Sequence, residues 1–342
     1  MSTLTILSAG PALSVQDQGR PGYLARGLTC GGAIDRLALA EGAALLRQSD
    51  TLAALEMGGM GGQFSFDADT RVALTGAPMP TTCDGETLAW NASHLIPAGA
   101  TLAIGVAARG SYGYLHVGGG LDTPEILGAR AAHLSAGIGA LLASGDTLPI
   151  GPDKGRETGL TLPLDQRFEG GTLRAVTSMQ TDRFDAATLK RFTATEFKRD
   201  PRANRMGVRL DPCGEGFEAE GGLNILSDVI VPGDIQVAGD GAPFVLMADC
   251  QTTGGYPRIG CVIPADMPRV AQAASGAPLR ITFIPLDEAR EIEARAARDR
   301  TALRALCTPL LRDPHDIRDL LGYQLISGAV SATANPFEET AP

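Results

Sequence analysis

The residues between Asp249 and Arg258 bring an unusual density of reactive side chains together. In order, the segment contains Asp249, Cys250, Gln251, Thr252, Thr253, Gly254, Gly255, Tyr256, Pro257 and Arg258. Gly254 and Gly255 permit positive φ and close backbone approach, so this loop can turn N–H groups and hydroxyls toward a small anionic or carbonyl-bearing ligand. The alternative is a tight loop whose polar groups satisfy its own backbone. Because that role requires neither Asp249 nor Arg258, we favour a ligand site.

A second group of charged residues and glycines lies near the start of the chain. It comprises Asp17, Gly19, Arg20, Gly31, Gly32, Asp35 and Arg36. From Ile34 onward, apolar residues recur at helical spacing and predict a helix. Asp35 in its first turn would stabilise the helix dipole, and glycines ahead of the helix would leave N–H groups free for an anion. The two roles are compatible.

The elements that must position these loops are mostly short strands. Residues 232–237 and 244–248 are apolar runs separated by the turn-rich residues 238–243, and the reactive loop follows the second run. Similar strand signals fill residues 1–150 and 171–285, and the step from Cys83 to Glu86 predicts a two-residue hairpin turn. One short helix is expected from Asp185 to Phe192, capped by Thr181 or Asp182.

These patterns divide the chain into two β domains and a tail. We expect a domain over residues 1–150, a breaker-rich linker over 151–170, a second domain over 171–285 and a helical tail over 286–342. The tail is predicted to be amphipathic from Leu286, to contain a second helix near Asp313 or Pro314, and to fray from Asn335. Packing on its own domain and docking of a partner are both open roles for it.

Composition restricts the class of protein. The 342 residues suffice for two cores, and 43 glycines with 22 prolines favour short strands and tight turns. A net charge of −10 argues against nucleic acid or an anionic membrane as a partner. Because the sequence has neither a leader-like segment nor an apolar run of membrane length, we expect a cytoplasmic protein.

Cysteine and histidine spacing predicts neither a disulfide framework nor a metal site. The six cysteines have no Cys-x-x-Cys spacing, and the four histidines have no His-x-x-x-His spacing. Cys250 lies in the reactive loop but has no histidine near it in sequence to activate the thiol. His116 precedes Gly118-Gly119-Gly120 and is the best placed histidine, although a structural role is expected for all four.

Familiar cofactor motifs are missing from the sequence. Gly58-Gly-Met-Gly-Gly62 lacks the lysine of a phosphate-binding loop, and there is no dinucleotide fingerprint. The lysines are Lys154, Lys190 and Lys198, and none stands in a biotin-carrier Met-Lys-Met. Any transferred carboxyl or phosphoryl group must therefore come from elsewhere.

Several motifs in a fixed order resemble the biotin-dependent carboxyltransferase-like family. They span roughly residues 4–285 and comprise Gln16-Asp17 with Gly19-Arg-Pro-Gly22, Gly32-Ala-Ile-Asp-Arg36, Ala73-Leu-Thr-Gly-Ala77, Gly118-Gly-Gly-Leu-Asp122, Asn204-Arg-Met-Gly-Val-Arg-Leu210, Val231-Pro-Gly-Asp-Ile-Gln-Val237 and the 251–258 loop. Departures are Val208 in place of a tyrosine, Cys250 in place of an arginine, and a missing Ser and Thr in residues 127–132. These departures remove one anion contact beside Asp249 and put a hydroxyl function in the third loop in doubt.

The resemblance implies two cyclophilin-like β-barrel domains and a role as one component of a larger enzyme. In the favoured interpretation, the chain joins an inhibitor-like subunit plus a third subunit of 5-oxoprolinase, and the complex uses ATP to open 5-oxoproline to L-glutamate. ATP and Mg would be bound by the assembled complex, and biotin is not expected. Two alternatives are the carboxyltransferase component of a biotin-dependent urea or acyl carboxylase, and a non-catalytic antagonist of a kinase inhibitor.

The chemistry of lactam opening suggests roles for individual residues. A carboxylate substrate favours an arginine fork, a lactam oxygen favours hydroxyl or N–H donors, and a carboxylate orients a Mg-bound phosphate or acts as a base. The expected catalytic residues are Asp17, Asp249, Gln251 and Arg258. The expected substrate-binding residues are Arg20, Asp35, Arg36, Arg205, Gln236, Thr252, Thr253, Gly254, Gly255 and Tyr256, and no metal ligands are assigned.

Overall fold

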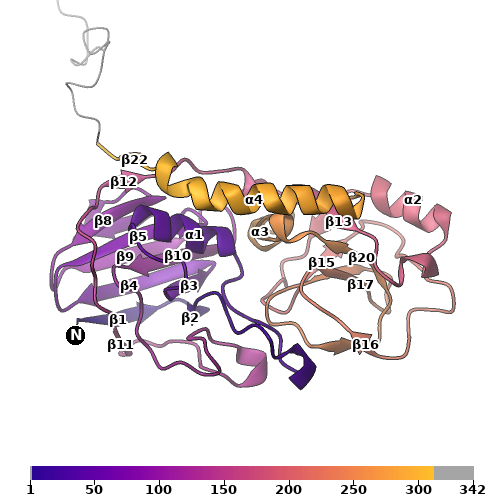
Figure 1. Cartoon of the computed structure of the whole chain (residues 1–342), viewed down its shortest axis with the longest axis horizontal. Coiled ribbons are helices and arrows are strands. Elements are labelled where there is room, and N and C mark those ends of the chain that lie inside the picture. Colours follow the sequence, from indigo (N-terminus) through magenta and orange to yellow (C-terminus); the bar gives the residue numbers. More distant parts are fainter. Residues whose placement is uncertain (1, 312–342) are drawn as a thin grey trace, which may run out of the picture.

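The N-terminal half of the chain consists of two β-sheets. A computed structural model describes residues 2–311, and Figure 1 shows its two halves side by side. The first sheet has the order β11-β1-β4-β9-β6-β7 and the second β2-β3-β10-β5-β8-β12-β22. The strands are β1 (Thr3–Ala9), β2 (Leu13–Gln16), β3 (Ala54–Gly58), β4 (Met60–Phe66), β5 (Thr70–Gly76), β6 (Thr81–Cys83), β7 (Glu86–Thr87), β8 (Ala92–Ile96), β9 (Thr101–Val106), β10 (Tyr112–Val117), β11 (Thr147–Pro149), β12 (Leu160–Thr161) and β22 (Thr308–Pro309).

The C-terminal half forms a closed seven-stranded barrel. Its strand order is β13-β20-β17-β18-β15-β14-β21, with β21 returning parallel to β13 to close it. A separate two-stranded ribbon joins β16 to β19. The strands are β13 (Gly171–Val176), β14 (Phe197–Arg199), β15 (Gly207–Asp211), β16 (Asp228–Val229), β17 (Asp234–Val237), β18 (Pro243–Leu246), β19 (Thr253–Gly254), β20 (Arg258–Val262) and β21 (Pro278–Phe283). The mainly β expectation is confirmed.

Local sequence signals account for several of these elements. The two apolar runs before the reactive loop form the β17–β18 hairpin, closed by Ala238 and Ala242. In the predicted turn after β6, Asp84 has φ +46° and Gly85 φ +90°, as a two-residue hairpin turn requires. The glycine-rich run from Gly58 to Gly62, which has no phosphate-binding lysine, lies at the end of β3 and in β4.

Four α-helices accompany the sheets in the described residues: α1 (Arg36–Leu45), α2 (Ala186–Ala194), α3 (Met267–Gln272) and α4 (Leu286–Leu306). The prediction that Thr181 or Asp182 caps α2 is wrong. Asp185 is its N-cap and accepts a 2.7 Å hydrogen bond from the Thr188 N–H, whereas Thr181 lies in a preceding 3-10 turn. The hydroxyl of Thr181 instead donates to the Ile259 carbonyl, a partner so remote in sequence that no local pattern indicates it.

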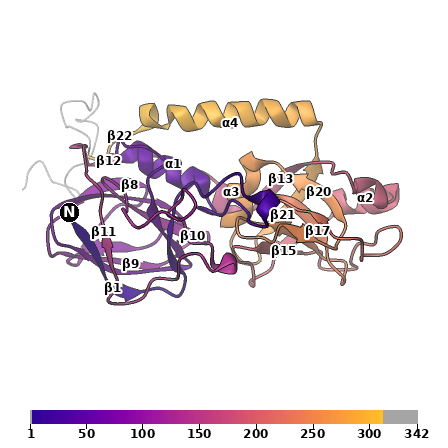
Figure 2. The ribbon, with the colours of Figure 1, turned by 60° about the horizontal axis from the view of Figure 1, so that its bottom comes forward.

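Helix α4 crosses from one half of the molecule to the other. It lies above α1 of the N-terminal half and α3 of the C-terminal half (Figures 1 and 2). Near its start, Glu293 accepts a 2.6 Å hydrogen bond from the Ala265 N–H, and after its end β22 pairs with β12. Among α4 residues Ala289 alone is buried, so the predicted amphipathic helix makes a narrow contact. The expected helix near Asp313 and the expected fraying from Asn335 lie outside the described residues.

Residues 151–170 are more than a connection. Their Leu160 and Thr161 form β12, which joins the N-terminal sheet through β8, and their Arg167 inserts a guanidinium beside α1. Apolar residues of both halves also share one core cluster, in which Ile34 and Tyr114 accompany barrel residues such as Ile235. The two halves are therefore packed against each other through side chains rather than linked by a free segment.

Within residues 2–311, no helix has the length and hydrophobicity needed to cross a membrane.

Candidate functional site

Arg205 joins loops of both halves at the centre of the molecule. Its guanidinium donates to both carboxylate oxygens of Asp249, over 2.8 and 2.9 Å, and to the Gly32 carbonyl over 2.7 Å. It also forms an ion pair with Glu56 of β3. The Asp249 side chain is 3% exposed and that of Glu56 2%, so both carboxylates are taken out of water and share one cation. This arrangement brings the two sequence clusters together.

Glu56 continues this network into the N-terminal sheet. Its second oxygen accepts a 2.9 Å hydrogen bond from the Ile34 N–H and a 2.6 Å hydrogen bond from the Tyr114 hydroxyl. Burial, with Glu56 close by, raises the pKa of Tyr114 well above its usual value, so the phenol stays a proton donor. Burial alone would lower the pKa of Arg205, but the neighbouring Glu56 and Asp249 carboxylates hold it above the usual range. Tyr114 therefore stays neutral and Arg205 stays charged at neutral pH.

Glycines allow the Asp17 and Gly32 loops to touch backbone to backbone. Gly19 has φ +77° and Gly32 φ +84°, and a Cβ on Gly32 would lie 2.6 Å from the Gly19 nitrogen and 2.8 Å from the Asp17 carbonyl oxygen. The Asp17 carboxylate accepts from the Gly19 N–H over 2.8 Å and from the Arg130 N–H over 2.6 Å. Asp17, expected to be catalytic, thus uses both oxygens to hold loops in place.

The two arginines of the N-terminal group, Arg20 and Arg36, also form hydrogen bonds to protein groups. Arg20 donates to the Ile126 and Ala131 carbonyls, while its buried Nη1 has no partner within the described residues. Arg36 is exposed and donates to the Gln18 carbonyl over 3.1 Å. Of these two expected substrate arginines, Arg36 therefore has the side chain that reaches solvent.

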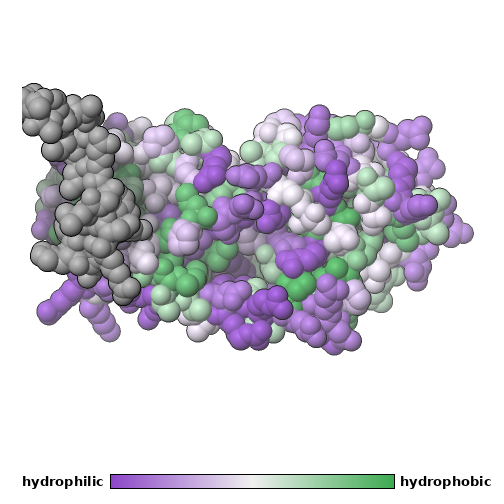
Figure 3. All heavy atoms as spheres, turned by 90° about the horizontal axis from the view of Figure 1, so that it is seen from above, coloured by the Kyte–Doolittle hydropathy of each residue, from purple (hydrophilic) through white to green (hydrophobic). Residues whose placement is uncertain are grey.

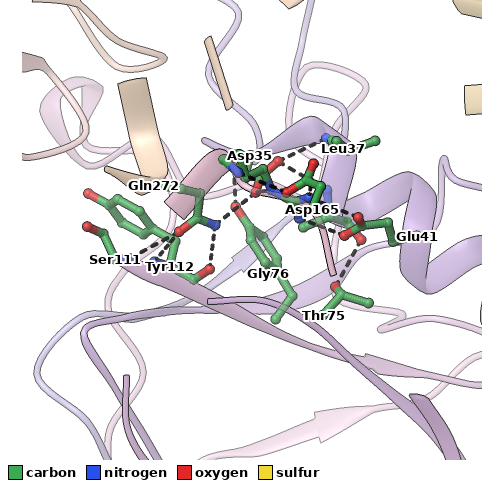
Figure 4. Close-up of polar contacts among 12 residues, drawn as sticks. Asp35, Leu37, Glu41, Thr75, Gly76, Ser111, Tyr112, Asp165 and Gln272 are labelled. Atoms are coloured by element: carbon green, nitrogen blue, oxygen red, sulfur yellow. Dashed lines mark hydrogen bonds and ion pairs between the residues drawn. The ribbon is translucent and has the colours of Figure 1, made fainter. Parts of the chain in front are cut away.

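Asp35 caps α1 and also accepts hydrogen bonds from two residues that pack between the two halves of the molecule. Its Oδ1 accepts from the N–H groups of Leu37 and Ala38, and its Oδ2 accepts from Arg167 over 2.9 Å and Gln272 over 2.8 Å (Figure 4). Asp35 is fully buried. The proposed capping role is therefore observed, and both oxygens are committed to it and to the interface.

Arg167 is surrounded by an excess of negative charge. It pairs with Asp35, with Asp165 over 3.0 Å and with Glu41, whose two oxygens lie 2.9 and 2.6 Å from its nitrogens. Figure 4 shows the carboxylates of Asp35, Asp165 and Glu41 converging on this point. One guanidinium cannot neutralise three carboxylates, and burial raises the pKa of Glu41 to about 7.

A cavity of about 750 Å³ opens beside these groups, between the two halves and beneath α4. Seen from the α4 side, the surface between the halves is hollowed, with both hydrophilic and hydrophobic residues around the hollow (Figure 3). Gly31, Met247 and Ala248 bring the cavity wall next to the Arg205–Asp249 pair. Among the described residues, two arginines line it, Arg36 and Arg300, against five carboxylates, those of Glu41, Asp50, Asp165, Glu293 and Asp299. The cavity by itself is unfavourable for a free anion.

The reactive loop divides between two places. Asp249 and Cys250 are buried, whereas Gln251, Thr253 and Tyr256 are exposed and Thr252 is half-buried. Arg258 lies in β20, pairs with Asp228 and lies 3.3 Å from Asp234, with its side chain 12% exposed. The structure thus places Arg258 in its own ion-pair group instead of joining it to Arg205 and Asp249.

Gly254 and Gly255 do not adopt positive φ, so that part of the expectation is wrong. Close approach is nonetheless required at Gly254, where a Cβ would lie 2.4 Å from the Gln236 Nε2. Gln236 is buried and donates a long, 3.4 Å hydrogen bond to the Tyr256 carbonyl. Gln236, Gly254 and Tyr256, all expected to bind substrate, therefore meet beside the β16–β19 ribbon.

Burial keeps two residues that the sequence analysis considered for a site in their neutral forms. Burial raises the pKa of Cys250 to about 12, so its thiol stays protonated at neutral pH. Burial lowers the pKa of His116 to about 3, and its Nε2 lies 2.8 Å from the Thr75 hydroxyl inside the N-terminal half. All six cysteines are free, and residues 2–311 contain no group of three His, Cys, Asp or Glu side chains arranged to hold a metal.

Sequence reasoning missed Glu56, Tyr114 and His133. Glu56 offered a signal, because it is the charged residue in the otherwise apolar β3 and buried carboxylates are rare without a partner. His133 lies in an irregular segment, and its position beside Thr29 and Asp249 depends on contacts between distant loops.

Comparisons with known proteins agree with this architecture. Residues 26–283 match the carboxyltransferase domain, subdomain A and B. The chain is 36% identical to the C-type subunit of 5-oxoprolinase from Escherichia coli (strain K12), over 84% of its own length and 93% of the relative's. It is 25% identical to urea amidolyase of Saccharomyces cerevisiae, covering 91% of this chain but 18% of that protein. The crystal structure of TTHA0988 superposes with a TM-score of 0.76 at 28% identity, covering 82% of this chain and 56% of that one. The chain therefore belongs to the family of carboxyltransferase domains with subdomains A and B.

Proposed function

We propose that this chain is the C-type subunit of an ATP-dependent 5-oxoprolinase, which opens 5-oxoproline to L-glutamate together with two partner subunits. The observation that carries the proposal is the 36% identity to the corresponding Escherichia coli 5-oxoprolinase chain over 93% of that protein's length. A match over nearly a whole relative supports a common role more strongly than a shared domain does.

The charge of the interdomain cavity supports the need for partners. 5-Oxoproline and ATP are anions, yet five carboxylates and two arginines of the described residues line the cavity. Arg205 is already neutralised by Asp249 and Glu56. A second protein surface must therefore supply cationic groups and close the site against water before a phosphorylated intermediate is stable there.

Within this chain, Arg36 is an exposed cation at the cavity wall and is suited to meet a substrate carboxylate. Asp249, held by Arg205, is suited to orient a polar group approaching from Ala248 and Gly31. ATP and Mg would supply activation of the lactam oxygen; the described residues hold no three-ligand metal group, so we assign both to the assembled complex. Biotin has no role in this proposal.

A second candidate function is the carboxyltransferase part of a biotin-dependent carboxylase. The similarity to yeast urea amidolyase along 91% of this chain favours it. It requires a biotinylated carrier on a separate chain. The identity is lower than for the 5-oxoprolinase relative, and the matched region is a small part of urea amidolyase.

Reconstitution separates these functions. We expect the purified chain alone to hydrolyse neither ATP nor 5-oxoproline, and a mixture with the inhibitor-like partner and the third 5-oxoprolinase component to release glutamate in proportion to ATP consumed. Dependence of turnover on a biotinylated carrier would favour the carboxyltransferase. An inactive mixture that still forms a tight complex would favour a regulatory antagonist.

A further inference from the structure

We propose that His133 is a positioning residue for the Asp249 loop and that protonation of its ring completes the hydrogen bonds that hold this loop. His133 belongs to the N-terminal half and approaches the backbone of residues 249 and 250 through two hydroxyl groups. The inference rests on the proposed function for its kinetic consequence, but not for the hydrogen-bond arrangement itself.

Each ring nitrogen of His133 faces one hydroxyl. Its Nε2 lies 2.8 Å from the Thr29 Oγ1, and its Nδ1 lies 3.2 Å from the Ser135 Oγ. Thr29 Oγ1 lies 3.0 Å from the Cys250 carbonyl oxygen, and Ser135 Oγ lies 3.0 Å from the Asp249 carbonyl oxygen. The imidazole is thus connected to two successive carbonyls of the reactive loop.

Counting protons shows why the charge of His133 matters. A carbonyl only accepts, and each hydroxyl has a single proton to donate. If both hydroxyls donate to their carbonyls, both ring nitrogens must donate to the hydroxyls, which requires the imidazolium. In neutral His133, one ring nitrogen accepts instead, so one hydroxyl turns toward the ring and releases its carbonyl.

The distances indicate which bond is released. An O–H donor forms a shorter hydrogen bond than an N–H donor. The 2.8 Å contact at Nε2 therefore fits donation by the Thr29 hydroxyl, and the 3.2 Å contact at Nδ1 fits a ring N–H donating to Ser135, so the neutral ring keeps its proton on Nδ1. Thr29 then donates to Nε2, and the Cys250 carbonyl loses its hydroxyl partner. The neutral state therefore loosens the loop at the residue next to Asp249, whose carboxylate binds Arg205.

The surroundings set the protonation of His133. Burial lowers its pKa, the Asp249 carboxylate opposes this by raising the pKa, and the guanidinium groups of Arg20 and Arg205 lower it. At neutral pH the ring is accordingly uncharged and the network incomplete. An anion arriving near these groups would raise the pKa and tighten the loop, since it offsets the two cations.

Histidine NMR on the isolated chain tests the arrangement directly. The chain has four histidines, and His116 stays neutral throughout, so the imidazole nitrogens of ¹⁵N-histidine-labelled protein are few enough to assign. At pH 7.5 we expect His133 as the Nδ1–H tautomer, and we expect Ser135→Ala to shift it toward the Nε2–H tautomer while Thr29→Val does not. An Nε2–H ring in the unaltered chain, or a ring charged from pH 5 to 8, would overturn the inference.

Hydrogen exchange and kinetics test the positioning. His133→Gln should speed backbone exchange in residues 247–251 about tenfold at pH 6 and lower kcat of the reconstituted complex about tenfold with little change in KM. His94→Gln is the matched control, because the ring of His94 contacts the carbonyl of Ala89 in the N-terminal sheet.

The pH dependence of turnover separates positioning from packing. The ratio of kcat for the unaltered complex to kcat for His133→Gln should grow as pH falls. A ratio independent of pH, with unchanged exchange in residues 247–251, would leave His133 a packing residue. If the mixture releases no glutamate, the proposed function fails, and tautomer and exchange alone decide this inference.

Discussion

Arg205 of the C-terminal barrel forms an ion pair with Glu56 of the N-terminal sheet, and through it the Asp249 loop is attached to both halves of the molecule. Removing either carboxylate would leave the guanidinium with a single counter-charge in a largely water-free place. The geometry of Asp249 therefore depends on residues that lie far apart along the chain.

Asp249→Asn is expected to cost stability as well as activity. The change keeps the shape of the side chain but replaces a charged acceptor of two Arg205 hydrogen bonds with an amide that offers one oxygen, and a hydrogen bond to a charged group contributes about 2 kcal/mol. Urea unfolding of the isolated chain measures the loss. Asp228→Asn is the control, since Asp228 is 49% exposed in its pair with Arg258 and should cost under about 1 kcal/mol. Equal losses would mean that the Arg205 pair is as weakly coupled as a surface pair.

Arg258→Ala gives a second comparison between ligand binding and structure. The sequence favoured a ligand role with little loss of stability, whereas the structure pairs Arg258 with Asp228 and with Asp234, whose side chain is 5% exposed. We expect unfolding free energy to fall by about 2 kcal/mol because Asp234 is left buried without its cation. Arg280→Ala, which removes a 64% exposed arginine from the 50% exposed Glu196, should change it by less than about 1 kcal/mol. Unchanged stability with lost turnover would restore the ligand role.

The contrast between these arginines shows what sequence reasoning could reach. Short-range signals identified the hairpin at Asp84 and Gly85 and the start of α1, because turn φ angles and helical spacing are local properties. Arg205 and Asp249 were both named as site residues, yet their direct pairing arises because β15 pairs with β18, which brings the residues flanking these strands together. Glu56, Tyr114 and His133 were missed since each contacts a partner far away in the sequence.

Glu41 makes stability depend on pH. Its folded pKa of about 7 exceeds the unfolded value of 4.5, so the folded protein binds an extra proton between these pH values. The free energy of unfolding should therefore decrease as pH rises from about 4.5 to 7, by at most about 3 kcal/mol from this group. Glu41→Gln cannot titrate and should remove that part of the slope. Denaturant unfolding at pH 5 and pH 7.5 checks this; identical pH slopes in both proteins would mean that Arg167 keeps Glu41 ionised throughout.

Gly32→Ala tests whether the contact between the two N-terminal loops supports the site. Gly32 has φ +84°, and an added Cβ would meet the Gly19 nitrogen at 2.6 Å, which is backbone and cannot turn aside. Gly22→Ala is a matched control, because Gly22 has φ +93° but nothing within 4 Å of the added Cβ. Both variants carry the left-handed strain of about 1 to 2 kcal/mol, so their difference isolates the steric clash. We expect the unfolding free energy of Gly32→Ala to fall by about 2 kcal/mol more than that of Gly22→Ala, as is usual for overpacking.

The two variants should also differ in activity. Because the Gly32 carbonyl accepts a hydrogen bond from Arg205, Gly32→Ala should reduce glutamate release by the reconstituted complex, whereas Gly22→Ala should not. Equal unfolding free energies and equal rates for the two variants would show that the loops separate without consequence for Arg205 and Asp249.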